Sequence, residues 1–167
     1  MATAIAQPDA ASSSQPRTVS YSTLRDILND LESLVAQGVV SSGKWTPAQN
    51  IDHVRRLMTV AREGTTMKLP LHMRLLGRLV LKRRIFTHAI PRGLKMPKAA
   101  ESVFLPPADV TLEQAMADMR NEVELCSRPG AMSQPSPLVG KISHENWTQL
   151  HCRHAELHFS NLHPAGN

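Results

Sequence analysis

Aromatic side chains are scarce in this chain of 167 residues, because Phe, Trp and Tyr together make up only 4% of it. Proteins that hold single-stranded nucleic acid stack successive bases on aromatic rings, so the composition argues against such a platform. Aliphatic residues and Met must therefore fill most of the interior. A hydrophobic content of 41% is enough for one folded domain of this length.

Long apolar runs and cysteine pairs are lacking as well. No run approaches the roughly 18 apolar residues of a membrane-spanning helix, so we expect no membrane partner. Two cysteines, Cys126 and Cys152, form no disulfide framework, which suits a reducing, cytoplasmic environment. Residues 1–19 contain no apolar stretch of signal-peptide length and are rich in Ala, Ser, Gln and Pro. We predict that they form a disordered tail.

Helical periodicity dominates the chain from Tyr21 onward. Apolar residues recur at helical spacing in four segments, at about 22–37, 46–63, 111–127 and from 143 through 158. Thr46 is followed three residues later by Gln49, which is the pattern of a capping box at a helix start. Strand-like alternation is scarce. We therefore predict an all-α four-helix bundle that occupies residues 20–163 as a single domain, with a short C-terminal tail at 164–167.

The connection between the second and third predicted helices is strongly basic. Residues 65–100 contain nine Lys or Arg residues and no Asp or Glu. Leucines near its start predict an extra short basic helix. The simplest interpretation is a solvated basic face whose leucines pack on the bundle. The alternative is a non-catalytic binding protein that uses this segment for an anionic ligand or partner. Nucleic acid is the partner we least expect, because the chain carries no recognition motif.

The last predicted helix carries three histidines on one face. His151, His154 and His158 are three, four and seven residues apart, and they share that face with Trp147 and Leu150. Buried imidazole nitrogens need partners, and one metal ion would satisfy several of them at once. A metal site is one interpretation of this face. Histidines satisfied by backbone carbonyls or buried water are the other.

A further histidine, His53, lies at the margin of the apolar face of the second predicted helix. If that helix faces the last one, His53 can meet the pair His154 and His158 across the core. Three neutral imidazoles would leave coordination positions open, as in catalytic metal sites. Zinc, nickel, copper and iron all accept such ligands, and of these we expect zinc or nickel.

The remaining histidines and the two cysteines are not predicted as ligands. His151 could be a fourth ligand, a proton shuttle beside the metal or a packed core residue, and the sequence leaves these three open. Cys152 points away from the histidine face, whereas Cys126 fits the core. We expect the other four histidines to be solvated in loops or surface turns, namely His72, His88, His144 and His163.

Two stretches resemble the DinB/YfiT-like superfamily of metal-dependent enzymes, and in particular an uncharacterised branch of it. They are residues 45–54 (WTPAQNIDHV) and 137–147 (PLVGKISHENW), the second leading into 151–158 (HCRHAELH). The helix layout from about 21 to 162 is similar too. Members share a four-helix bundle in which one His of the second helix and an HxxxH pair of the last helix bind a divalent metal. The resemblance implies His53, His154 and His158 as these ligands.

The chain departs from the branch pattern at Leu157 and Ser136, where relatives often carry histidine. Neither position is an implied ligand. Some superfamily members are thiol-dependent transferases or isomerases, so the resemblance implies a small-molecule substrate such as a low-molecular-weight thiol. No carboxylate lies unambiguously inward on either histidine helix, which suits thiol transfer better than hydrolysis. The substrate, the general base and the oligomeric state stay open, with a homodimer among the arrangements.

Overall fold

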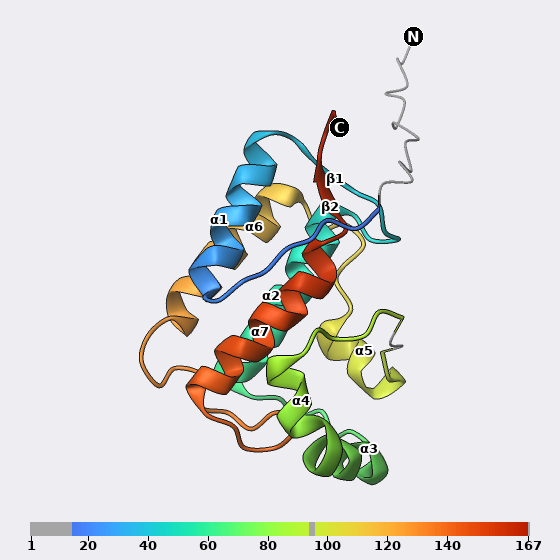
Figure 1. Ribbon diagram of the computed structural model, residues 1–167, viewed down its shortest axis with the longest axis vertical. Helices are drawn as coiled ribbons and strands as arrows, with labels where there is room; N and C mark the ends of the chain where they lie inside the picture. Colours follow the sequence, from blue (N-terminus) through green and yellow to red (C-terminus); the bar gives the residue numbers. More distant parts are fainter. Residues whose placement is uncertain (1–14, 94–95, 167) are drawn as a thin grey trace.

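Four long helices form the framework of the part of the chain that the computed structural model describes, residues 15–93 and 96–166. They are α1 (Leu24–Ala36), α2 (Pro47–Glu63), α6 (Leu112–Cys126) and α7 (His144–Phe159). α1 and α2 each pack against both α6 and α7, and the four helices form the bundle seen in Figure 1. The predicted all-α fold is confirmed. In this described part of the chain, no helix is long and apolar enough to cross a membrane.

Side-chain caps fix where these helices begin. At α2 the hydroxyl of Thr46 accepts from the Gln49 amide at 3.2 Å, and the Gln49 side chain accepts from the Thr46 amide at 3.0 Å. This is the reciprocal capping box that the sequence predicts. At α6 the Thr111 hydroxyl accepts from the backbone amide three residues on, as does the Ser143 hydroxyl at α7. The two histidine-bearing helices therefore have well-defined starts.

The core between the helices is aliphatic and rich in methionine, as the composition predicts. Its largest fully buried side chains include Trp147 and Phe159 from α7, and the others come mainly from α1, α2 and α6. The indole N–H of Trp147 donates to the Gln134 carbonyl at 2.9 Å, which satisfies the one polar atom of that ring. Cys126 lies in this core, as predicted.

The connection between α2 and α6 is more helical than predicted. It holds one continuous helical segment, made of α3 (Leu71–Leu76), the π-helical η1 (Gly77–Leu81) and α4 (Lys82–Thr87), followed by α5 (Lys98–Phe104). The sequence predicted a single short basic helix here. α5 lies between Pro97 and Pro106, since Pro is tolerated at helix boundaries but not in a helix interior.

A short sheet closes one end of the bundle and corrects the predicted C-terminal tail. β1 (Val39–Ser41) pairs antiparallel with β2 (Leu162–Pro164). The Ala165 amide then donates to the Gly38 carbonyl at 2.6 Å. Residues 164 and 165 are thus held by backbone hydrogen bonds, while Asn167 lies outside the described residues. Strands of three residues are too short to leave a clear alternation in the sequence.

The N-terminal prediction also needs a correction. Of the predicted tail at 1–19, residues 1–14 lie outside the described residues. Arg17, however, forms a bidentate ion pair with Asp30 of α1, in which two guanidinium nitrogens donate to the two carboxylate oxygens at 3.1 and 2.8 Å. Its amide donates to the Ser160 carbonyl at 2.7 Å. The described part of this segment therefore belongs to the packed domain, because a bidentate Arg–carboxylate pair fixes it to the bundle.

Candidate metal centre

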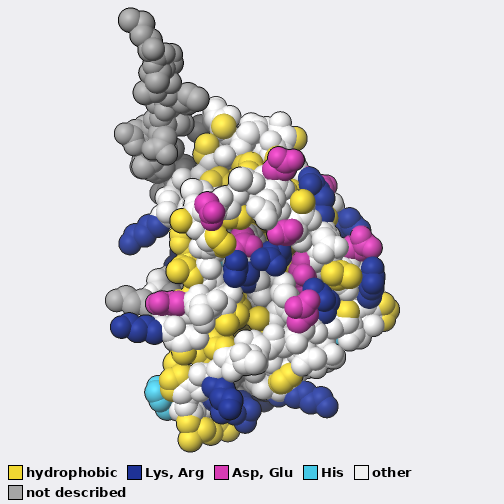
Figure 2. Space-filling model, turned by 180° about the vertical axis from the view of Figure 1, so that it is seen from behind, with side chains coloured by type: hydrophobic (Ala, Val, Ile, Leu, Met, Phe, Trp, Pro, Cys, Tyr) yellow, Lys and Arg dark blue, Asp and Glu magenta, His cyan; other side chains and the backbone are white. Residues whose placement is uncertain are grey.

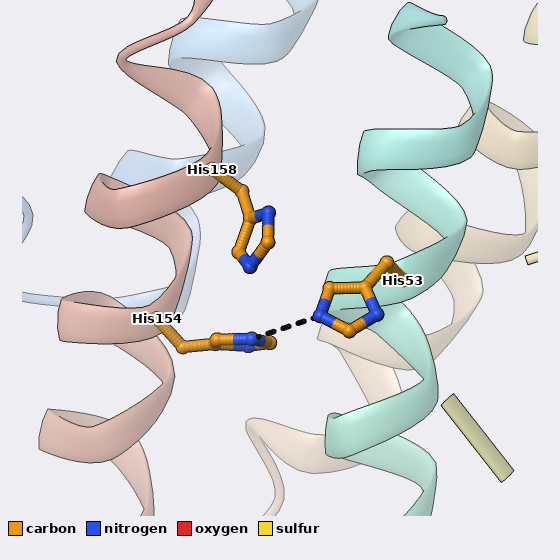
Figure 3. Close-up of side chains that lie close together, drawn as sticks. All are labelled: His53, His154 and His158. Atoms are coloured by element: carbon orange, nitrogen blue, oxygen red, sulfur yellow. Dashed lines mark hydrogen bonds between the residues drawn. The ribbon is translucent and has the colours of Figure 1, made fainter. Parts of the chain in front are cut away.

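Three histidines from two helices meet in the bundle core. His53 lies on α2, and His154 and His158 lie one turn apart on α7. One ring nitrogen of each lies within 4.8 Å of the others. Figure 3 shows the three rings directed toward a common point between the helices. The structure thus brings together the three residues that the sequence singled out.

The orientation of His53 is set by a backbone carbonyl. Its Nδ1 lies 2.8 Å from the carbonyl oxygen of Phe104, the last residue of α5. A carbonyl oxygen can only accept, so Nδ1 of His53 carries the proton. In the neutral ring Nε2 then bears a free lone pair, which points toward His154. This is the arrangement that fixes ligating histidines in metal sites.

The spacing of the nitrogens fits a metal ion. Nε2 of His53 and Nε2 of His154 lie 3.2 Å apart (Figure 3). In tetrahedral zinc sites the Zn–N bonds of about 2.05 Å place two ligand nitrogens about 3.3 Å apart. Nδ1 of His154 is buried without a hydrogen-bond partner. A cation between the two Nε2 atoms would not contact this Nδ1, so the spacing of the Nε2 atoms, and not the unpartnered nitrogen, is what fits a metal ion.

Burial keeps the three imidazoles in their neutral, metal-binding form. It lowers the pKa of His158 to about 3 and, together with the neighbouring imidazoles, holds the pKa of His154 well below its usual range. Burial also lowers the pKa of His53, against the opposing effect of the Phe104 carbonyl. Desolvation disfavours a charged ring. Each ring is accordingly neutral at neutral pH and keeps one unprotonated nitrogen.

Trp45 forms one wall of the site. Its ring stacks on His158 with centroids 5.8 Å apart and planes 15° from parallel, and it lies 4.7 Å from the ring of His53. Phe104 makes an edge contact with His53 at 6.4 Å. These two aromatic residues restrict the approach of water to the rings. The sequence predicted no role for either of them. The contribution of Phe104 includes a backbone carbonyl, which leaves no side-chain signature.

His151 lies apart from this group. It is fully buried, stacks on Trp147 with centroids 5.3 Å apart, and neither of its ring nitrogens has a partner in the described structure. Burial lowers its pKa to about 3. Of the alternatives that the sequence left open, the geometry fits a packed core residue best, since the group of ring nitrogens within 4.8 Å does not include it.

Two carboxylates on the histidine-bearing helices are already engaged. Asp52, beside His53 in the chain, is 3% exposed, although the sequence placed no carboxylate clearly inward on this helix. Arg55 and Arg56 hold its two oxygens at 2.6 Å each. Although burial acts to raise it, these hydrogen bonds keep the pKa of Asp52 below its usual value. On α7, Glu156 accepts from the Tyr21 amide and pairs with an arginine of its own helix. Neither carboxylate is free to act as a general base at the histidines.

One further prediction on side-chain placement is corrected. His163 lies in β2, is 8% exposed and approaches the Ser42 hydroxyl at 3.1 Å, so it is not a solvated histidine. Cys152 is 1% exposed and lies outside the three-histidine group. His72 and His88 are exposed, as predicted. None of these residues joins the three-histidine group.

The fold and the site together define an all-α bundle with a candidate three-histidine metal centre. The chain matches the family described as "Protein of unknown function (DUF1569)" over residues 13–165. That match spans most of the chain, which therefore belongs to this family. No curated protein and no solved structure matches the chain.

Proposed function

We propose that the protein binds a divalent metal ion through His53, His154 and His158. The observation that carries the proposal is the 3.2 Å separation between Nε2 of His53 and Nε2 of His154. Nε2 of His53 is deprotonated, because Nδ1 of the same ring donates its proton to the Phe104 carbonyl. Three neutral nitrogen ligands suit zinc or nickel. Because no carboxylate completes the set, a bound ion would keep its full charge and would favour an anionic fourth ligand.

We further propose that the DUF1569 family belongs to the DinB/YfiT-like superfamily. Three observations support this placement: the four-helix bundle, a histidine on the second long helix, and an HxxxH pair on the last helix. The motifs around residues 45–54 and 137–147 add to it. In this superfamily the histidines would form a resident metal centre rather than a structural cross-link.

The reaction class that fits this centre best is metal-dependent transfer of a low-molecular-weight thiol. A divalent ion held by three imidazoles supplies a Lewis acid that lowers the pKa of a bound thiol. A reaction that starts from a thiolate needs no strong general base from the protein, and Asp52 and Glu156 on the two histidine helices are held by arginines or a backbone amide. Hydrolysis fits less well, because a free base beside the metal would assist proton removal from bound water.

The protein's own groups would orient and shield the reactants. The Phe104 carbonyl fixes the ring of His53 so that its lone pair faces inward. Trp45 lies against His158 and limits access of water to that side. The neutral state of the three imidazoles leaves them free to ligate without first losing a proton. These residues bind and position, and no other side chain of the site is assigned a chemical step.

Calorimetric titration of chelator-stripped protein with Zn²⁺ and Ni²⁺ tests the metal site. We expect one ion per chain, and we expect His154→Ala to weaken binding at least about a hundredfold because it removes a direct ligand. His72→Ala is the matched control, since His72 is exposed on α3. Equal binding by both variants would contradict the site.

A second measurement tests the thiol. Addition of a small thiol to the Co²⁺-loaded protein should produce a thiolate-to-cobalt charge-transfer band. The band should be absent in His154→Ala. Stoichiometric metal binding without such a band would leave the metal site standing and would contradict the thiol-transfer reaction.

A further inference from the structure

A helical segment at one end of the molecule exposes a large apolar face. It runs from Leu71 to Thr87 through α3, η1 and α4. Five of its aliphatic side chains are between 47% and 81% exposed, namely Leu71, Leu75, Leu76, Leu79 and Val80. The sequence favoured leucines packed on the bundle, and the structure shows that interpretation to be wrong for these five. Soluble proteins seldom expose such a contiguous aliphatic patch without a binding role.

Contacts on the opposite face fix which side is exposed. A Cβ atom placed on Gly77 would clash with the Leu138 carbonyl oxygen, so the helix backbone touches the 136–140 loop directly there. Lys82 donates to the Lys141 carbonyl at 3.1 Å. α4 also packs against α7. The segment cannot rotate to bury its leucines without losing these contacts.

Cationic side chains surround the apolar face. Arg78, Arg83 and Arg84 are exposed on the same segment, and residues 65–100 contain no acidic residue. Figure 2 shows hydrophobic and Lys or Arg side chains next to one another at this lower end of the molecule. An aliphatic face with a basic border is the pattern of helices that lie in the interface of an anionic membrane.

We propose that this segment docks the protein onto a lipid surface that contains anionic headgroups. Leu71, Leu75 and Leu79 follow one another at four-residue spacing along the helix, so they can enter the boundary between headgroups and acyl chains together. The arginines then lie level with the lipid phosphates. The earlier expectation of no membrane partner rested on the absence of a spanning helix, and surface docking requires none.

Charge argues for lipid over a second copy of the chain. A symmetric dimer through this face would bring two copies of residues 71–87, with five Lys or Arg residues each, against one another, with no carboxylate in either copy to pair with them. An anionic bilayer neutralises that charge. Duplex nucleic acid would also attract it, but phosphate contacts give five exposed aliphatic side chains nothing to bury against.

Co-sedimentation with vesicles tests the proposal. The intact protein should bind vesicles that contain phosphatidylglycerol, should bind pure phosphatidylcholine much more weakly, and should dissociate as salt is raised. Leu75→Gln/Leu79→Gln keeps helix-forming residues and should weaken binding at least about tenfold. Arg83→Glu/Arg84→Glu should weaken it at least about 25-fold, since each cation near an anionic surface contributes about fivefold.

Matched controls separate this surface from general effects. Arg25→Glu/Arg128→Glu changes the net charge by the same amount as Arg83→Glu/Arg84→Glu, but at exposed positions in α1 and just after α6. Val40→Gln removes an exposed aliphatic side chain from β1. Both should bind vesicles as the native chain does. Calorimetric Zn²⁺ binding should be the same in all variants, so failure here is distinguishable from failure of the metal site.

Three outcomes would overturn the proposal. One is equal or no binding to the two vesicle types. Another is that the native chain binds no vesicles but forms a dimer in sedimentation equilibrium, and that Leu75→Gln/Leu79→Gln dissociates this dimer. That result would assign the face to a second copy of the chain. The third is loss of duplex DNA binding in the arginine variant with vesicle binding unchanged, which would assign the cations to nucleic acid. Circular dichroism of each variant confirms that the bundle is intact.

Discussion

The buried imidazole of His151 should make the metal-free protein sensitive to mild acid. The side chain is fully buried and neither ring nitrogen has a partner in the described structure. Burial lowers its pKa to about 3. In the unfolded chain a histidine takes up a proton below about pH 6.5. Between these two values the unfolded state binds a proton that the folded state does not, so stability falls as the pH falls.

The size of this effect follows from the difference in pKa. Each pH unit below about 6.5 removes about 1.4 kcal/mol of unfolding free energy for one such histidine. At about pH 5 the loss is therefore about 2 kcal/mol for His151. His158, whose pKa burial also lowers to about 3, contributes a similar amount. Together they remove a large share of the about 5–15 kcal/mol that stabilises a domain.

The substitution His151→Leu isolates one of these contributions. Leucine is similar in volume and has no polar atom to leave unpartnered, so the unfolding free energy at about pH 7 should rise by about 1–2 kcal/mol. The stability lost between about pH 6.5 and about pH 5 should shrink by about 2 kcal/mol. Urea denaturation of chelator-treated protein at the two pH values, followed by far-ultraviolet circular dichroism, measures both quantities.

His72→Leu serves as the control, because His72 is exposed and its removal should leave the pH dependence unchanged. The reasoning is refuted if His151→Leu keeps the full pH dependence of the native chain. It is also refuted if the substitution lowers the unfolding free energy at neutral pH, since that would show that the imidazole makes a stabilising polar interaction in the folded protein.

Three further predictions concern the site and the core. Glu122→Gln should lower the unfolding free energy by about 1–2 kcal/mol, because it removes the buried carboxylate that accepts from Arg62 at 2.9 Å. The loss stays moderate because Arg62 keeps its pair with Glu63 at 2.8 Å, and urea denaturation measures it. Ni²⁺ binding should quench the fluorescence of Trp45, which stacks on His158, and Trp45→Phe should remove most of that quenching while ITC shows one bound ion. Zn²⁺ affinity should stay nearly constant from about pH 7 to about pH 6, because burial lowers the pKa of all three histidines below about 6.5. A tenfold fall in affinity over that range would contradict the neutral state of the three rings.

Local patterns in the sequence determined the four long helices. Thr46 and Gln49 mark the start of α2 within one turn, and the 3.6-residue period identifies its inward side chains. The same period places His154 and His158 on one face of α7, because a spacing of four residues brings two side chains to successive turns. The three-histidine group could therefore be predicted, with the resemblance to a known superfamily supplying the pairing with His53.

Tertiary packing alone decided the geometry of the three histidines and which face of the segment at 71–87 is exposed. The distance between His53 and His154 depends on how α2 packs on α7, and the tautomer of His53 depends on a carbonyl of α5, 51 residues away in the chain. Leu75 and Leu79 are a second example of what the sequence leaves open. Their spacing predicts a helix with an apolar face, but a periodic pattern does not specify whether that face packs on the bundle or is exposed to solvent. The close approach at Gly77 turned it toward solvent, because packing depends on contacts between segments distant in sequence.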